Sequence, residues 1–361
     1  ITFMWDIKLD VGHGVRTVDD CKNEARKDLT IVTNLMETRT LAGPDELRQA
    51  MVECTGPQHL WPSTEFFTAK WQEQTERHQK HHDIDNNLEP NIKNGVGGLR
   101  DIHTIVWILQ RQYGDNQLEN LTSRGILTDF EFGMLHRCRD FLWQIRYALH
   151  MVTQREEDHL LFDFQKEIAS ILGFTDEDDR LAVEVMMHQY YRYSLALNEL
   201  NDLLMLLFNE IIIDSQRPQQ ISSINQHFQR CNDYLEIKQP DLFEHTPSAM
   251  LEVFYTLASD DSLKGVRANT IRALRDNRHA IDDNFRSDPD NTRSFMAIIR
   301  NPNHLQRELD RMLRYGILGQ YIPEFGGIIG HMQHDLFHSY TIDQHSLRAI
   351  KFMRKLRFDE H

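Results

Sequence analysis

Two long stretches of helical periodicity constrain what this chain can fold into. Residues 128–153 and 181–213 each carry apolar side chains at helical spacing over a broad face. A helix with such a face buries it against other helices, and long helices of this kind are typical of a bundle. We therefore predict a mainly α fold with a helical bundle in the middle of the chain.

Shorter helical patterns surround these two. After Gly43-Pro44 the sequence is almost entirely helical in pattern, with a polar, charged helix over about 65–82 and an amphipathic one over 99–113. Thr341-Ile342-Asp343-Gln344 has the form of a capping box, S/T-x-x-E/Q, which predicts the start of a last helix. Other helices are predicted after Pro247 and near residues 268, 293 and 303.

The N-terminal residues alternate with a different period. Apolar side chains recur at every second position from Phe3 to Val11, with acidic and basic side chains between them. A period of two predicts a half-buried β-strand. Gly12-His13-Gly14 interrupts this pattern, and Thr17 is expected to cap a helix that runs to about Leu41.

Length and charge exclude some classes of function. A chain of 361 residues is long enough for two or three domains. Its formal net charge of −15 disfavours a nucleic-acid binder, because such proteins need a basic surface to neutralise phosphates. The most apolar stretch, Leu203–Ile213, is interrupted by Asn209 and Glu210, so we expect no membrane span and no exported leader.

The cysteines point to a reducing compartment. They are far apart and form no C-x-x-C pair, which fits neither a zinc site nor a disulfide framework. We expect small buried side chains in a cytoplasmic protein at Cys21, Cys54, Cys138 and Cys231.

Two aspartates on the predicted strand are candidates for metal or base chemistry. Asp6 and Asp10 lie on one face of the strand, but four strand residues separate them by about 13 Å. Two ligands of one ion must converge at about 2 Å each, so at most one of the two belongs to a given metal site. Solvated strand carboxylates remain an equally good interpretation.

A glycine-rich run, Lys93-Asn94-Gly95-Val96-Gly97-Gly98-Leu99-Arg100-Asp101, precedes the predicted helix at 99–113. Such a loop can expose backbone N–H groups to an anion, and Lys93 and Arg100 would add positive charge. The run has neither the G-K-[ST] of a P-loop nor the G-x-G-x-x-G spacing. From the residues alone, a tight loop that needs its glycines only for backbone conformation is slightly favoured.

Histidines gather near the C-terminus, at His331, His334, His338 and His345. His345, one turn into the capped helix, is the best single ligand candidate, but one ligand does not make a site. A second group, His78, His81 and His82 with Asp83, is interpreted as a solvated, cationic helix end.

Several motifs, in this order along the chain, resemble one bacterial family. Trp5–Thr17 (WDIKLDVGHGVRT) resembles the final strand and exit turn of a nucleotidyltransferase domain. Asn87–Lys93 (NLEPNIK), continuing to Gly97–His103 (GGLRDIH), resembles the signature of a helical middle domain. Met312–Glu324 (MLRYGILGQYIPE) and Asp335–Ser346 (DLFHSYTIDQHS) resemble the beginning of an HD domain. Together they resemble the PII uridylyltransferase/uridylyl-removing enzymes.

The resemblance implies an organisation for the whole chain. Residues 1–55 would be the C-terminal strand/helix part of an α/β nucleotidyltransferase domain, 56–320 the helical-bundle middle domain, and 321–361 the first helices of an HD phosphohydrolase domain. It implies an enzyme that transfers UMP from UTP to a tyrosine of the PII nitrogen-signalling protein and hydrolyses it off again. Mg²⁺, or Mn²⁺, is the implied cofactor, and glutamine the implied effector of the complete enzyme.

The resemblance also implies roles for particular residues. Asp6, or Asp10 as the fallback, matches the third metal-binding carboxylate of the transferase, and His345 the first metal ligand of the HD domain. The other ligands are expected outside residues 1–361, so this segment alone is expected to have neither activity. Expected at the cleft, where they would meet triphosphate or PII, are His13, Arg16, Lys93, Arg100 and Asp101.

Two alternatives stay open at this stage. A protein adenylyltransferase of the same superfamily carries a similar glycine-rich run, although the segment from Tyr340 to His345 disfavours it. A non-catalytic helical interaction module is also compatible with the bundle and the acidic charge.

Overall fold

The chain forms two compact units. The computed structural model describes residues 2–9, 11–85, 88–114, 118–177, 179–302, 304–334 and 340–358. The first unit comprises residues 1–72 and 106–117, and the second comprises residues 73–105 and 118–361. Two long helices, α5 (Ser63–Asp85) and α6 (Leu99–Tyr113), contribute to both. These divisions fall at other positions than the predicted domain boundaries, which stay a prediction.

The first unit consists of short helices. Thr17 caps α2 as predicted, because its hydroxyl accepts from the Asp20 N–H while the Asp20 carboxylate accepts from the Thr17 N–H. The predicted helix to Leu41 is two helices instead, since Asp28 has an extended backbone and caps the next helix through its side chain. The elements are α1 (Thr2–Asp6), α2 (Val18–Lys27), α3 (Leu29–Met36) and α4 (Asp45–Cys54).

The prediction of a strand over residues 3–11 is wrong. Residues Thr2–Asp6 form the helical turn α1, and its apolar side chains, including Phe3 and Trp5, are exposed. A strand is stable only when a neighbouring strand pairs with its N–H and C=O groups. Among the described residues no strand pairs with this segment, so its backbone forms local hydrogen bonds such as Leu9 N to Met4 O.

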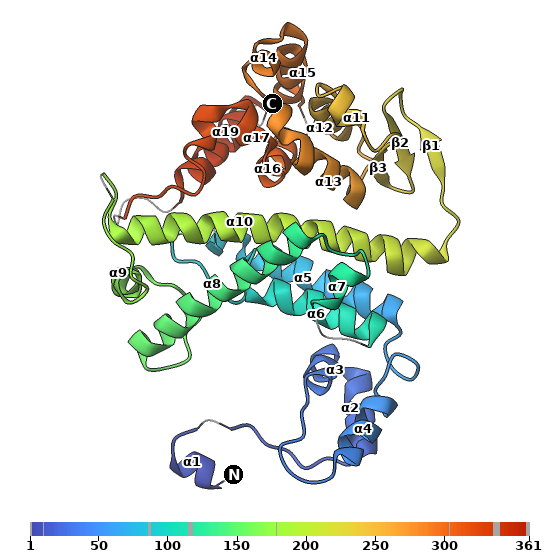
Figure 1. Ribbon diagram of the computed structural model, residues 1–361, viewed down its shortest axis with the longest axis vertical. Helices are drawn as coiled ribbons and strands as arrows, with labels where there is room; N and C mark the ends of the chain where they lie inside the picture. The colour runs from blue at the N-terminus through green and yellow to red at the C-terminus, as the bar shows by residue number, and fades with distance from the viewer. Residues whose placement is uncertain are drawn as a thin grey trace. The chain divides into compact units, whose positions relative to one another are not determined.

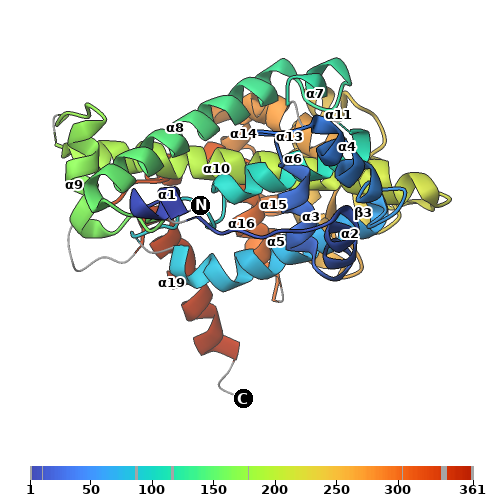
Figure 2. The same cartoon turned by 90° about the horizontal axis from the view of Figure 1, so that it is seen from below.

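The second unit is built around one long helix, α10 (Ala182–Phe208). Figure 1 shows α8 on one side of α10 and α13, α16 and α19 on the other, and Figure 2 shows α8 running alongside α10. The two longest helices confirm the predicted ranges closely, and a π-helical turn, Asn209–Ile213, extends α10. The helices of this half are α7 (Asn120–Ser123), α8 (Asp129–Thr153), α9 (Phe162–Ile171) and α10.

Helix α8 shows how the sequence produces this arrangement. Thr128 and Glu131 form a capping box at its start, which satisfies two backbone donors. Leu135, Leu142 and Leu149 recur at seven-residue spacing and are fully buried. Burial of each such leucine contributes about 2 kcal/mol, so the apolar face fixes which side of α8 meets α10.

The C-terminal half of this unit combines short helices with a small sheet that the sequence did not predict. The four-stranded sheet has the order β1-β2-β3-β4, with β1, β2 and β3 antiparallel and β4 parallel to β3. Its strands are β1 (Ile221–Ser223), β2 (Phe228–Cys231), β3 (Tyr234–Ile237) and β4 (Gly265–Val266). A 3₁₀ turn, Asp214–Gln216, leads into the sheet.

The helices after the sheet confirm the predictions of helices after Pro247 and near residues 268, 293 and 303. They are α11 (Leu242–His245), α12 (Ala249–Ser259), α13 (Ala268–Asn277), a 3₁₀ turn (Arg278–Ala280), α14 (Asp283–Ser287), α15 (Pro289–Arg300), α16 (Leu305–Arg314), α17 (Ile317–Tyr321), α18 (Pro323–Gly326) and α19 (Ile342–Phe358). Helix α19 begins directly after Thr341, as the capping-box motif predicted.

Neither membrane-spanning helices nor disulfides are found in the described residues. No helix there is both long and apolar enough to cross a bilayer. All four cysteines are free thiols. The expectation of burial holds for Cys138 and Cys231 but is wrong for Cys21 and Cys54, which are half-exposed.

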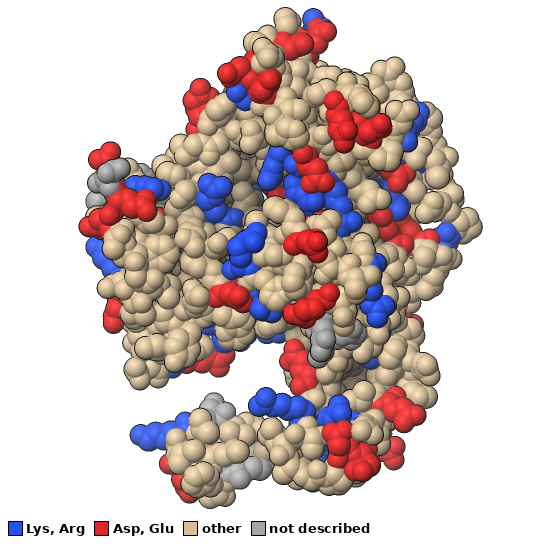
Figure 3. All heavy atoms as spheres, viewed as in Figure 1, with Lys and Arg blue, Asp and Glu red and all other residues tan. Residues whose placement is uncertain are grey.

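Carboxylates of α8 and α10 hold the helices that follow the sheet. Glu131 is buried and forms ion pairs of 2.8 Å with both Arg272 and Arg275 of α13. On α10, Asp202 pairs with Arg314 of α16. Over the face in Figure 3 acidic and basic side chains are likewise interspersed. The earlier helices thus supply the acids of these contacts, and the later helices supply the arginines.

Replacing Glu131 with Gln should lower the free energy of unfolding by about 3 kcal/mol. The substitution removes the charge that compensates two largely buried arginines. Urea unfolding near neutral pH, followed by circular dichroism, measures the change. The exposed neighbour Asp129→Asn is the control and should stay within about 0.5 kcal/mol of the unchanged chain.

The same variant has a defined pH dependence. Burial opposes ionisation of Glu131, but the hydrogen bonds from Arg272, Thr128 and Arg275 outweigh it and hold the pKa of Glu131 below its ordinary value. Its ionised form therefore stabilises the fold above the unfolded pKa of about 4.3, and this contribution is lost as the pH falls through the lower folded pKa. The stability difference between the unchanged chain and the variant should shrink in acid. A difference that grows in acid would contradict this assignment.

Candidate functional site

The glycine-rich run folds into a tight turn around one buried carboxylate, Asp101. Its Oδ1 accepts hydrogen bonds from Gln74 (3.0 Å), Arg77 (2.7 Å) and His78 (2.9 Å), and its Oδ2 accepts from the Gly97 N–H (2.9 Å). Burial opposes ionisation, but His78 and Arg77 outweigh it and hold the pKa of Asp101 below its usual range. Asp101 therefore ties the start of α6 to α5.

The N–H groups of this turn are used within it. Gly95 N donates to Asn91 O, Gly98 N to Gly95 O, and Arg100 N to Lys93 O, at 2.8–3.0 Å. In this conformation these donors are not offered to an anion, as they would be in a phosphate-binding loop. The interpretation slightly favoured by the residues alone, a loop that needs glycines for its backbone, fits this geometry.

Gly97 shows why the glycines are required. Its φ is 71°, in the left-handed region, and a Cβ there would overlap the Ser194 carbonyl oxygen on α10. Ser194 Oγ in turn donates to Val96 O at 2.8 Å. The turn therefore approaches α10 backbone to backbone.

The basic residues of the run are already engaged by protein groups. The Lys93 ammonium lies 3.3 Å from Glu156 and 3.2 Å from Asp158, with about a quarter of its side chain exposed. Arg100 is half-buried on the first turn of α6. Both stay predicted contacts for triphosphate or PII, as does the fully buried Asp101.

His78 is placed differently from the prediction of a solvated helix end. It is largely enclosed, with 22% of its side chain exposed, and contacts Asp101. The reason is that α5 turns this face toward the glycine-rich turn, where Arg77 also donates to Asn94 O. The side chains of His81, His82 and Asp83 lie outside the described residues.

The C-terminal histidines are spread over separate environments. His334 stacks on Phe162 with ring centroids 3.7 Å apart. His331 meets His188 of α10 at 4.2 Å, and burial, followed by the nearby His331, lowers the pKa of His188 to about 4. His338 and Asp335 lie outside the described residues.

The candidate metal ligands stand alone in their units. Asp6, His13 and Arg16 belong to the first unit and are exposed, whereas His345 is exposed on α19 of the second. Asp10 lies outside the described residues. Within the described part of the chain, no three His, Cys, Asp or Glu side chains are arranged to hold a metal ion. Asp6 and His345 therefore stay predictions as single metal ligands.

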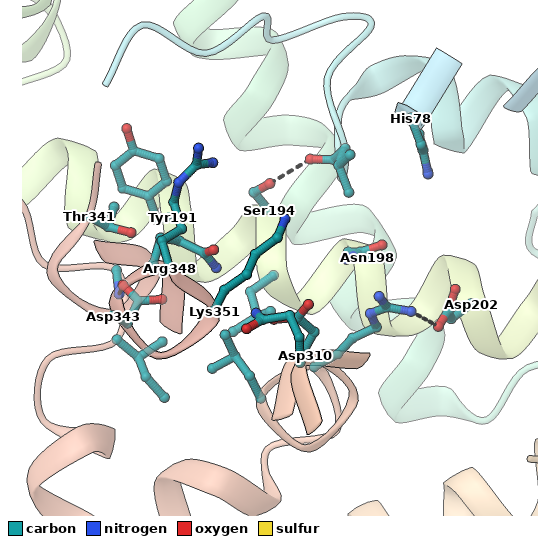
Figure 4. A pocket seen from close by; sticks show the side chains of 18 residues that line it. His78, Tyr191, Ser194, Asn198, Asp202, Asp310, Thr341, Asp343, Arg348 and Lys351 are labelled. Atoms are coloured by element: carbon teal, nitrogen blue, oxygen red, sulfur yellow. Dashed lines mark hydrogen bonds and ion pairs between the residues drawn. The ribbon is translucent and has the colours of Figure 1, made fainter. Parts of the chain in front are cut away.

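Sequence reasoning missed a cavity of about 310 Å³ in the second unit, which polar and apolar side chains line together. It lies where α10, α16 and α19 meet, and Figure 4 shows its lining. Tyr191, Ser194, Asn198 and Asp202 follow one another at helical spacing on α10 and face it. This stripe of polar side chains at helical spacing along α10 is the signal that could have revealed the cavity.

The sequence defines the class of protein. Residues 65–205 match the family model described as GlnD PII-uridylyltransferase, and residues 228–321 match the one described as uridylyltransferase GlnD third domain. The chain belongs to this uridylyltransferase family.

Individual relatives match along the whole chain. It is 52% identical over 360 residues to a bifunctional uridylyltransferase/uridylyl-removing enzyme of Pseudomonas aeruginosa. Proteins of the same name from Pseudomonas syringae pv. tomato and Pseudomonas putida are 51% and 49% identical over 362 and 358 residues. These alignments cover 99–100% of this chain but only 40% of each relative. No solved structure matches.

The close approach at Gly97 gives a paired prediction. Gly97→Ala should lower the free energy of unfolding by about 3 kcal/mol or more, because strain at positive φ adds to the overlap with Ser194. Gly125 has nearly the same φ, 69°, but open space around its α-carbon, so Gly125→Ala should cost only about 1–2 kcal/mol. Urea unfolding of both variants measures the difference, and equal losses would contradict the close approach.

Proposed function

We propose that this chain is the central part of a bifunctional enzyme of nitrogen regulation. The enzyme transfers UMP from UTP to a tyrosine of the PII signalling protein and hydrolyses the uridylyl group off again, with glutamine as effector. The observation that carries this proposal is the 52% identity over 360 residues to a relative named for both activities. Such identity along the full chain disfavours both the adenylylating relative and a non-catalytic module.

The proposed domain organisation follows the resemblance. Residues 1–55 close the nucleotidyltransferase domain, 56–320 form the helical middle domain, and 321–361 open the HD domain. The two family matches, over 65–205 and 228–321, support a helical middle in two consecutive parts. The enzyme works in the cytoplasm.

The proposed chemistry divides between residues at the two ends. Mg²⁺, or Mn²⁺, would neutralise the triphosphate in transfer and activate water in removal. Asp6 contributes one carboxylate to the first process, and His345 one imidazole to the second. His13 and Arg16 meet triphosphate or PII near the first site.

The glycine-rich turn positions the remaining binding residues. Asp101 fixes the backbone between Lys93 and Arg100 through its bonds to Gly97 and α5. Lys93 then presents a partly exposed ammonium group held by Glu156 and Asp158. We propose that it exchanges one of these carboxylates for an anionic group of triphosphate or of PII.

His345→Ala, made in the complete enzyme, should reduce uridylyl removal by roughly 100-fold or more and leave transfer intact. Loss of a ligand costs at least as much as loss of a group that supports one. Release of UMP from labelled PII and incorporation from radiolabelled UTP measure the two activities. His245→Ala, an exposed histidine on α11, is the matched control and should change neither. Equal loss of both activities, or unchanged removal, would refute the role of His345.

Asp6→Asn, made in the same enzyme, should show the reverse pattern. Transfer should fall by roughly 100-fold or more, because a carboxylate ligand of the triphosphate-bound metal becomes a neutral amide, and removal should persist. Asp19→Asn, an exposed aspartate in the first turn of α2, is the control. If Asp6→Asn transfers normally, the third carboxylate lies elsewhere. If even the unchanged enzyme labels no PII, the proposed function itself fails.

A further inference from the structure

Two cysteines that are far apart in the sequence belong to neighbouring helices of the first unit. Cys21 lies on α2 and Cys54 is the last residue of α4, and these two helices pack against each other (Figure 1). Both side chains are half-exposed, unlike the buried thiols of Cys138 and Cys231. A small reagent in solution can therefore reach this pair, whereas the other two thiols are enclosed.

The Cys54 sulfur contacts the part of α2 that the Cys21 side chain covers. Cys54 Sγ lies 3.8 Å from the Val18 carbonyl oxygen. Val18 is one turn before Cys21, and a helical side chain covers the turn on the N-terminal side of its own α-carbon. The Cys21 side chain therefore extends over the same turn that the Cys54 sulfur contacts. The two thiols are neighbours across the contact between α2 and α4.

The ionisation of Cys54 is consistent with this placement. Burial raises the pKa of Cys54, the Lys22 ammonium partly offsets the shift, and the Cys21 sulfur adds to it. One thiol affects the ionisation of another in this way only when the two are near. Since burial disfavours the Cys54 thiolate, we expect Cys21 to react first with a reagent in solution and Cys54 to react second.

The position of Cys54 allows the adjustment that a covalent bond requires. A disulfide needs its two α-carbons about 4.4–6.8 Å apart. Cys54 ends α4, and the last turn of a helix opens at a much lower cost than its interior. In the reduced form the Cys54 thiol donates to the Met51 carbonyl oxygen of its own helix at 3.2 Å. A thiol is a weak donor, so little is lost when this bond is given up.

From this arrangement we propose that Cys21 and Cys54 form a reversible disulfide when the chain meets a small disulfide such as oxidised glutathione. The Cys21 thiolate attacks one glutathione sulfur, which forms a mixed disulfide and releases one glutathione thiolate. The Cys54 thiolate then attacks the Cys21 sulfur, forms the Cys21–Cys54 bond and releases the second glutathione thiolate. Two electrons pass from the cysteines to the small disulfide, and the two protons of the cysteines pass to the released thiolates.

The bond connects α2 to α4 and stabilises the first unit in its oxidised form. It closes a loop of about 30 residues, which restricts the unfolded chain. An excess of reduced glutathione runs the same exchange backwards, so the link is transient in a reducing compartment. This proposal does not depend on the uridylyltransferase function.

Treatment of the intact chain with oxidised glutathione, followed by alkylation of the remaining thiols in urea and peptide mass spectrometry, tests the pair. The peptides of Cys21 and Cys54 should be linked within one chain, with a loss of about 2 Da, and Cys138 and Cys231 should be alkylated. Hydrogen exchange in the peptides of α2 and α4 should slow by about tenfold or more. Reduced glutathione should reverse both changes.

Two serine variants separate the roles of the thiols. Cys54→Ser should accumulate a mixed disulfide between glutathione and Cys21, because the second attack is missing. Cys21→Ser should react more slowly, and in neither variant should hydrogen exchange slow. A stable mixed disulfide in the unchanged chain, disulfide-linked dimers, or a link through Cys138 or Cys231 would overturn the proposal, as would the absence of any reaction. Circular dichroism of the reduced variants, with Cys21→Ala and Cys54→Ala as second choices, establishes that each is folded.

Discussion

The ion pairs between α8 and α10 on one side and α13 and α16 on the other are the contacts on which the second unit depends. Glu131 holds Arg272 and Arg275 in a place where all three are largely out of water, and Asp202 holds Arg314 beside the cavity. Such pairs contribute little net stability compared with apolar side chains, but they are strongly destabilising when one partner is lost. They therefore select one arrangement of these helices, while buried apolar side chains such as the leucines of α8 supply net stabilisation.

The pKa of a second carboxylate in the same interface, Glu199, is shifted in the opposite direction to that of Glu131. Burial raises the pKa of Glu199 on α10, although Arg278 partly offsets the shift from 3.9 Å away, and one of its oxygens has no hydrogen-bond partner. A raised folded pKa means that ionisation of Glu199 disfavours the folded state as the pH rises through the unfolded pKa. In acid, Glu131 no longer stabilises the fold, whereas protonation of Glu199 removes a destabilising buried charge. The two effects of pH on the free energy of unfolding therefore partly cancel.

The helices could be predicted from the sequence because their signal is local and long. Residues 99–113 and 128–153 combine many periodic apolar positions with clear starts; α6 has the predicted bounds, and α8 begins one residue later than predicted. The strand over residues 3–11 failed because alternation shows a face, but not whether a neighbouring strand exists to pair with it. The hairpin at β2–β3 escaped notice because its strands span only four residues each. They join at Asn232-Asp233, a weaker turn signal than Asn-Gly, with Asn232 at φ 54°.

The candidate site also has one part that the sequence can predict and another that only the fold determines. The glycines at 95–98 could be interpreted from their residue types, since positive φ and close approach are properties of glycine itself. The hydrogen bonds of Asp101 to Gln74 and His78 could not, because they join α5 and α6 across a loop whose path only the fold sets. The cavity is even harder to predict from the sequence, because the fold brings together α10, α16 and α19, whose lining residues span positions 191 to 351. A lysine such as Lys351 is unremarkable on its own helix, and only the fold places it in the lining of the same cavity as Asn198 of α10.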